Sequence, residues 1–124
     1  MKQVLYHIYH NPRCSKSREA LKLLSIKTDN YKIIKYLEVE MNKKYLTEII
    51  EKLKVSSNNI LRKSEKTYKK LKLRKSDLSI DEIVNIILTY PILLQRPIIA
   101  KYQNNNLVKT LIGRPPEEIL SILD

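Results

Sequence analysis

The spacing of apolar residues changes along the chain, from strand-like runs at both ends to helical spacing in the middle. Val4–Tyr9 and Tyr31–Leu37 are short runs rich in β-branched and aromatic residues, which is typical of strands. Between them, Ala20, Leu21 and Leu24 fall three and four positions apart, the spacing of one buried helix face. A strand, a helix and a second strand in this order predict a right-handed parallel βαβ unit over residues 1–37.

Residues 42–90 have helical spacing instead. Two apolar stripes share this pattern: Leu46, Ile49, Ile50 and Leu53 in the first, and Ile80, Ile83, Val84 and Ile87 in the second. Ser79 and Glu82 have the spacing of a capping box at the start of the second helix. Residues 58–72 predict one or two short helical turns with loops, so we expect an all-helical insertion over about residues 41–90.

Beyond Pro91 the pattern returns to strands. Ile98–Ala100 and Leu107–Ile112 predict a third and a fourth strand, joined by a hairpin loop over residues 101–106. Arg96 precedes the proline that starts the third strand, so its backbone is extended and a cis bond is possible there. Gly113 and the Pro-Pro-Glu-Glu segment after it predict a closing helix. Its packing residues are Ile119, Leu120, Ile122 and Leu123.

These elements predict an α/β fold, with a mixed four-stranded sheet flanked by helices and a helical insertion after the second strand. A chain of 124 residues is long enough to bury one core without disulfides or metal, so we expect a single domain over residues 1–124.

The net charge of +11 has three possible meanings: a nucleic-acid partner, an anionic substrate or a lysine-rich solvated surface. The densest basic run, residues 69–75, contains Leu71 and Leu73, and the chain has no Trp or Phe. We therefore favour a solvated face anchored by leucines over a nucleic-acid surface. No run approaches the ~18 apolar residues of a membrane span and no secretory signal is present, so we expect a cytoplasmic protein with no membrane partner.

Cys14, the only cysteine, lies in the turn between the first strand and the first helix. Asn11-Pro12 ends the strand, which places Cys14 at the carboxyl edge of the sheet, where open α/β sheets bind ligands. A helix N-terminus favours a thiolate by about 0.3–1 kcal/mol and at most ~2, whereas lowering a thiol pKa by about two units needs roughly 3 kcal/mol. Cations must therefore contribute, and the candidates nearby in sequence are Arg13, Lys16, Arg18 and His10.

The alternative for Cys14 is a small buried hydrophobe, as most free cysteines are. A turn flanked by Pro, Arg, Lys and Ser is a poor apolar environment, so we favour a reactive thiol in a reducing compartment. Ser17 occupies the third position after Cys14, so the chain has no C-x-x-C motif and any disulfide step takes its second sulfur from another molecule.

Two further observations concern candidate ligands. Arg62 follows the apolar pair Ile60-Leu61 and is either held at the inner edge of the domain or exposed, and the spacing does not decide between these. His7 and His10 would point to opposite faces of a strand, and we predict no metal site.

Four segments, in this order, resemble the glutaredoxin-coupled arsenate reductase family, a branch of the thioredoxin-like fold. They are IYHNPRCSKSREAL (Ile8–Leu21), ILRK (Ile60–Lys63), PILLQRPI (Pro91–Ile98) and IGRPPE (Ile112–Glu117). The resemblance covers nearly the whole chain and implies that the mixed sheet is thioredoxin-like.

The resemblance also implies roles for single residues. Cys14 matches the nucleophile that attacks the arsenic of arsenate, and His10 and Ser17 match positions that support its thiolate. Arg62, Arg96 and Arg114 match three arginines that cradle the oxyanion. Their guanidinium forks suit an anion with several oxygens, because each can form two charge-assisted hydrogen bonds. The implied partners are arsenate or a similar oxyanion, glutathione as co-substrate and glutaredoxin; we expect no bound cofactor and a monomer.

Two other functions remain open. The same fold branch contains redox-related transcriptional regulators that bind RNA polymerase, and a charge of +11 suits an acidic partner, but these regulators use a C-x-x-C motif. The other is a thiol enzyme that acts on a different oxyanion. A phosphatase-type reductase is excluded, because it needs an arginine six positions after the nucleophile and this position is Ala20.

Overall fold

The chain folds into two compact units. One combines Met1–Val39 with Arg96–Asp124, and the other is Glu40–Gln95. The computed structural model describes residues 3–53, 59–71 and 78–123. The single-domain organisation over residues 1–124 stays a prediction.

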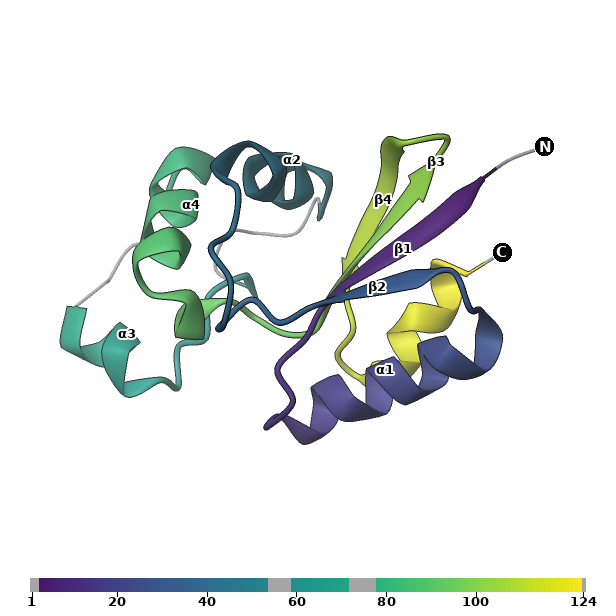
Figure 1. Ribbon diagram of the computed structural model, residues 1–124. Helices are drawn as coiled ribbons and strands as arrows, with labels where there is room; N and C mark the ends of the chain where they lie inside the picture. The colour runs from purple at the N-terminus through teal and green to yellow at the C-terminus, as the bar shows by residue number, and fades with distance from the viewer. Residues whose placement is uncertain (1–2, 54–58, 72–77, 124) are drawn as a thin grey trace. The chain divides into compact units, whose positions relative to one another are not determined.

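The first unit is built on a four-stranded sheet (Figure 1). Its strands are β1 (Val4–Tyr9), β2 (Tyr31–Ile34), β3 (Ile98–Gln103) and β4 (Asn106–Ile112), in the spatial order β2-β1-β3-β4. β1 and β2 are parallel, while β1–β3 and β3–β4 are antiparallel. The mixed sheet predicted from the sequence is therefore confirmed, including its parallel first pair.

Two helical segments, α1 (Ser15–Lys27) and the 3-10 helix η3 (Pro116–Ser121), pack together on one face of this sheet (Figure 1). The buried core they share consists of Tyr6, Ile8, Ala20, Leu24, Ile99, Ile119 and Ile122. Helix spacing in the sequence correctly gave Ala20 and Leu24, both completely buried. Burying an aliphatic side chain contributes about 1.5–3 kcal/mol, so this cluster anchors α1 to the sheet.

The hairpin between β3 and β4 differs from the prediction. β3 continues to Gln103, and only Asn104 and Asn105 form the turn, with φ of 51° and 69°. Asn tolerates this left-handed conformation, which the two-residue hairpin requires. The predicted loop over residues 101–106 was wrong, because Lys101 lies within the sheet and is only 4% exposed.

The end of the second strand and the character of the closing helix also differ from the predictions. β2 ends at Ile34 instead of residue 37, because the chain turns at Lys35, whose carbonyl accepts a hydrogen bond from Glu38 N at 2.9 Å. The closing helix is a 3-10 helix that buries Ile119, whereas Leu120 is 45% exposed.

The second unit is helical and contains α2 (Lys43–Leu53), α3 (Lys66–Leu71), α4 (Ile80–Thr89) and the 3-10 helix η2 (Pro91–Leu93). α2 and α4 pack against each other. The predicted apolar stripes are buried except for Ile80, which is 39% exposed. Predictions for residues 54–58 and 72–77, including much of the basic run, lie outside the described residues.

The predicted capping box is present at the start of α4. Glu82 N donates to Ser79 Oγ at 3.1 Å, and Ser79 N donates to Glu82 Oε1 at 2.9 Å. These bonds satisfy two backbone donors that a helix start otherwise leaves unpaired. None of the helices in the described ranges has the length and apolar character that crossing a bilayer requires.

Candidate active site

Cys14 occupies the position directly before α1, in the turn that follows β1. Asn11 fixes this turn, since its carbonyl oxygen accepts from Cys14 N and its side-chain oxygen accepts from Arg13 N, both at 3.0 Å. Asn side chains favour turns through such local bonds. Because β1 and β2 are parallel, the thiol lies at the carboxyl edge of this strand pair, as the sequence predicted.

The environment of the thiol favours its ionised form. Burial raises the pKa of Cys14, but the backbone N–H of Ser17, the guanidinium of Arg96 and the backbone N–H of Lys16 outweigh burial and bring the pKa below its usual value. Hydrogen bonding to the sulfur by Ser17 N–H and by Arg96 lowers the pKa more than the charge of Arg96 does. Cys14 is partly exposed, which excludes the alternative of a fully buried hydrophobe.

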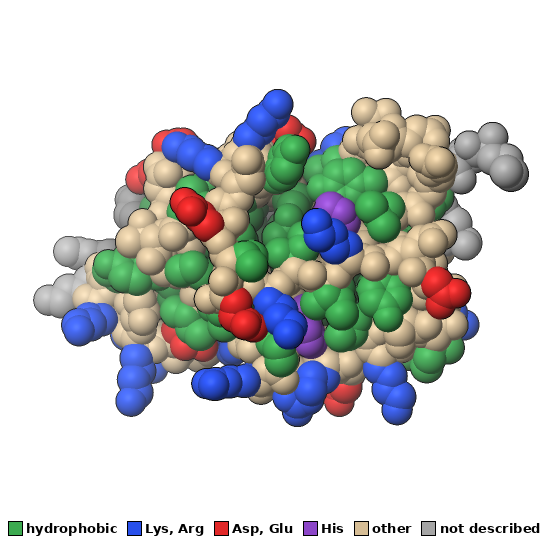
Figure 2. All heavy atoms as spheres, viewed as in Figure 1, with side chains coloured by type: hydrophobic (Ala, Val, Ile, Leu, Met, Phe, Trp, Pro, Cys, Tyr) green, Lys and Arg blue, Asp and Glu red, His purple; other side chains and the backbone are tan. Residues whose placement is uncertain are grey.

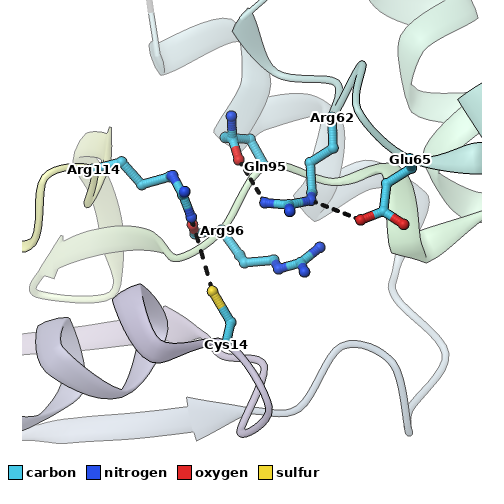
Figure 3. A network of polar contacts seen from close by, with 6 residues as sticks. All are labelled: Cys14, Arg62, Glu65, Gln95, Arg96 and Arg114. Carbon is cyan, nitrogen blue, oxygen red and sulfur yellow. Dashed lines mark hydrogen bonds and ion pairs between the residues drawn. The ribbon is translucent and has the colours of Figure 1, made fainter.

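Two arginines from the other end of the chain lie beside this sulfur (Figure 3). Arg114 Nη1 is 3.8 Å from Cys14 Sγ and donates to the carbonyl oxygen of Arg96 at 3.1 Å. Arg96, itself only 8% exposed, lowers the thiol pKa by hydrogen bonding and by charge. The fold thus brings together Cys14, Arg96 and Arg114, three of the residues selected from the sequence.

The sheet explains why these arginines are neighbours. Arg96 lies shortly before the start of β3, separated from it by Pro97, and Arg114 lies shortly after the end of β4, separated from it by Gly113; these strand ends pair through Ile98 and Ile112. The pairing is extended by Gly113 N, which donates to the carbonyl of Pro97 at 2.8 Å. An antiparallel pair brings the start of one strand to the end of the next.

Gly113 allows this close packing because it has no side chain. A Cβ at this position would lie 3.0 Å from Pro97 Cγ and 3.1 Å from Ile119 Cγ2, both closer than ordinary contacts. The chain's only glycine therefore stands where a larger residue would push the Arg96 and Arg114 segments apart.

His10 and Ser17 form a buried pair next to the turn. His10 Nδ1 lies 2.7 Å from Ser17 Oγ, which also accepts from Asn11 N at 3.1 Å. Burial, followed by the charges of Lys35 and Arg18, lowers the pKa of His10 and favours the neutral ring. A neutral Nδ1 can accept the Ser17 hydroxyl proton, so the pair ties the end of β1 to the first turn of α1.

The cations close to Cys14 in sequence make other contacts. Lys16 Nζ is 3.8 Å from a carboxylate oxygen of Glu19, and Arg18 Nη1 donates to the carbonyl of Pro12 at 2.8 Å. Arg13 is exposed. Side-chain charge therefore reaches the sulfur from Arg96 and Arg114, and Lys16 contributes through its backbone N–H.

Arg62 belongs to the helical unit and is held firmly there. Its Nε lies 3.2 Å from Glu65 Oε2 and its Nη1 donates to Gln95 Oε1 at 3.2 Å (Figure 3), while its backbone N donates to Leu93. The Arg62 side chain is only 16% exposed. Of the two alternatives left open by the sequence, an arginine held in place is therefore correct and an exposed arginine is wrong. Sequence reasoning missed Glu65 and Gln95, although the opposite charge three positions after Arg62 was a signal that could have identified Glu65. The oxyanion role of Arg62 stays a prediction.

In the part of the chain that the structure describes, no group of three or more His, Cys, Asp or Glu side chains could hold a metal ion. The face drawn in Figure 2 carries Lys and Arg as separate projections with Asp and Glu among them.

A thiol with a lowered pKa lies between a helix start and two guanidinium groups, an arrangement that suits a nucleophilic sulfur. Comparison with known proteins finds relatives that are similar to this chain along almost its whole length. The ArsC family model matches residues 9–122. An arsenate reductase of Haemophilus influenzae is 40% identical over 117 residues, covering 94% of this chain and 97% of the relative. The uncharacterized protein YfgD of Escherichia coli K12 is 38% identical over 117 residues, covering 94% of each chain.

A solved structure gives the same result for the fold. The arsenate reductase from Vibrio cholerae superposes with a TM-score of 0.82 at 37% identity, covering 97% of this chain and 98% of that one. The chain therefore belongs to the ArsC family, and its mixed sheet is the predicted thioredoxin-like one.

Proposed function

We propose that this protein is an arsenate reductase in which the Cys14 thiolate attacks arsenate and glutathione and glutaredoxin supply the electrons. One observation carries most of the weight: the Cys14 thiol has a lowered pKa and lies 3.8 Å from an Arg114 guanidinium nitrogen. The names of similar proteins support arsenate as the substrate.

In the proposed first step, an arsenate ion binds against Arg96 and Arg114, with Arg62 as a third ligand. Bidentate guanidinium bonds neutralise the oxyanion and present its arsenic to the sulfur. Cys14 Sγ then forms an S–As bond, and one arsenate oxygen leaves as water after protonation. The arginines also stabilise negative charge that develops during the attack.

Reduction follows in the proposed second stage, which needs thiols from outside the chain because Cys14 is its only cysteine. Glutathione adds to the arsenic, and glutaredoxin then reduces the adduct. The glutaredoxin thiolate attacks the glutathione sulfur, the bond between that sulfur and arsenic breaks, and the resulting glutathione–glutaredoxin disulfide leaves its two electrons on arsenic, which becomes As(III). Water then cleaves the bond between arsenic and Cys14 Sγ, which releases arsenite and returns the Cys14 thiol.

The test is a coupled assay with arsenate, glutathione, glutaredoxin, glutathione reductase and NADPH. We expect arsenate-dependent NADPH oxidation and arsenite formation, both abolished in Cys14→Ser. Arg96→Ala should lower kcat/KM for arsenate about a hundredfold, because an arginine that contacts a transition-state charge contributes roughly 3 kcal/mol. Lys22→Ala, an exposed change on α1 with the same loss of charge, is the matched control.

Two outcomes would contradict the proposal. Turnover that survives Cys14→Ser would exclude the covalent step. A wild-type protein that binds RNA polymerase and gives no arsenite would support the regulatory alternative, whereas turnover of another oxyanion alone would leave the thiol chemistry and replace the substrate.

A further inference from the structure

The turn that carries Cys14 has cations on two sides. Arg96 and Arg114 approach it from the β3–β4 side and act on the sulfur. Arg18 contacts the turn from the first turn of α1, Lys35 directly follows β2, and both are exposed. The proposed oxyanion occupies the first pair, so the second pair is available to a different anion.

Hydrogen bonds place the second pair next to the turn. Arg18 Nη1 bonds the Pro12 carbonyl at 2.8 Å, so its guanidinium folds back over the segment that precedes Cys14. Lys35 follows Ile34, whose carbonyl accepts from His10 N at 2.8 Å, so Lys35 leaves β2 level with His10. The positive charges of both residues also add to the effect of burial in lowering the pKa of His10.

The carboxylate next to Arg18 in sequence pairs with a different cation. The first turn of α1 has no acidic residue, and Glu19 is engaged with Lys16. Within residues 3–53, 59–71 and 78–123, neither Arg18 nor Lys35 forms an ion pair with a carboxylate. Exposed cations next to a nucleophilic sulfur favour an incoming thiol that is itself an anion.

We infer that Arg18 and Lys35 form a subsite for the carboxylates of the glutathione molecule that reacts at Cys14. This inference rests on the proposed use of glutathione and assigns its binding position. Glutathione carries one free carboxylate on the residue on each side of its thiol-bearing residue, so two negative charges accompany the sulfur that it delivers. Arg18 presents a fork to one carboxylate and Lys35 a point charge to the other.

The test needs no arsenate, which separates it from the test of the proposed function. The Cys14 thiolate attacks one sulfur of oxidised glutathione, the S–S bond breaks, and the released glutathione thiolate takes a proton from water. The same reaction with the uncharged 2-hydroxyethyl disulfide is the reference. Dividing the rate with oxidised glutathione by the rate with 2-hydroxyethyl disulfide cancels any change in the thiolate population. Mass spectrometry identifies the mixed disulfide, because the chain has one cysteine.

We expect the ratio to fall about tenfold in Arg18→Gln/Lys35→Gln at low ionic strength, and about threefold in Lys35→Gln, which leaves the Arg18–Pro12 bond intact. Lys22→Gln/Lys27→Gln removes the same charge from exposed positions further along α1 and should not change it.

A ratio that is equal in wild type and the double variant, or that falls equally in the control, overturns the inference. A loss of rate with glutaredoxin but not with oxidised glutathione also overturns it, since the cations would then serve protein docking.

Discussion

Removing Arg114 should raise the pKa of the Cys14 thiol. Arg114 Nη1 lies 3.8 Å from the sulfur. Two unit charges at about 4 Å interact by about 1 kcal/mol in water and about 4 kcal/mol at an effective dielectric constant of 20. Arg114 is exposed and Cys14 is partly exposed, so solvent screens the pair. We therefore take about 1.5 kcal/mol for the interaction energy between the guanidinium and the thiolate. This energy corresponds to a rise of about one pKa unit in Arg114→Ala.

The measurement is the pH dependence of alkylation by iodoacetamide, a neutral reagent that reports on the thiolate alone. Arg114→Lys keeps a positive charge but lacks the planar fork, so we expect it to retain about half of the effect while binding arsenate poorly. Lys22→Ala serves as the charge-matched control and should not move the midpoint. A midpoint that is the same in Arg114→Ala and wild type would refute the assignment of Arg114 as a stabilising neighbour of the thiolate.

Three other predictions concern stability and titration. Gly113→Ala should lower the free energy of unfolding, measured in urea, by about 1–3 kcal/mol, because the new Cβ would lie 3.0 Å from Pro97 Cγ. An unchanged urea midpoint would contradict this, since Pro97 and Ile119 would then move aside without cost. Ser79→Ala should destabilise α4 by about 1 kcal/mol through the lost cap, and a smaller loss than in an exposed Ser25→Ala control would contradict this. His7 and His10 should titrate in NMR spectra below the usual value of about 6.5. The unfolded chain then binds more protons in this range, so stability should fall as the pH drops from about 6.5 through the folded-state values, and two unshifted histidines would exclude the effect.

Local patterns in the sequence predicted the elements that make local contacts. β1 and α1 were found because alternation and helix spacing there agree with what the fold buries. The β3–β4 loop was wrong because Lys101 looked like a loop residue, yet it lies in β3 opposite Tyr6 and is buried by its neighbours. Tertiary packing overrode the preference of a single residue.

In the candidate site, too, local features were predicted from the sequence and contacts between distant residues were not. The turn at Cys14 follows from the residues around it, but the approach of Arg114 does not, since the two residues are 100 positions apart in the chain. Only the resemblance to a family connected them in advance. The local sequence also offered His10, Arg13, Lys16 and Arg18 as candidate cations near the sulfur, whereas the folded chain brings the side chains of Arg96 and Arg114 there.

The position of Cys14 at the start of α1 links the pKa of its thiol to the stability of the fold. Any group that favours the thiolate in the folded protein also stabilises the fold once the sulfur is ionised. This stabilisation is complete above the thiol pKa of the unfolded chain and disappears as the pH falls through the lower folded-state pKa. A sulfur alkylated by iodoacetamide carries no charge and brings none with it, so the alkylated protein should melt at a lower temperature than the resting protein at mildly alkaline pH. A melting curve therefore reports the charge state of this one sulfur without any substrate.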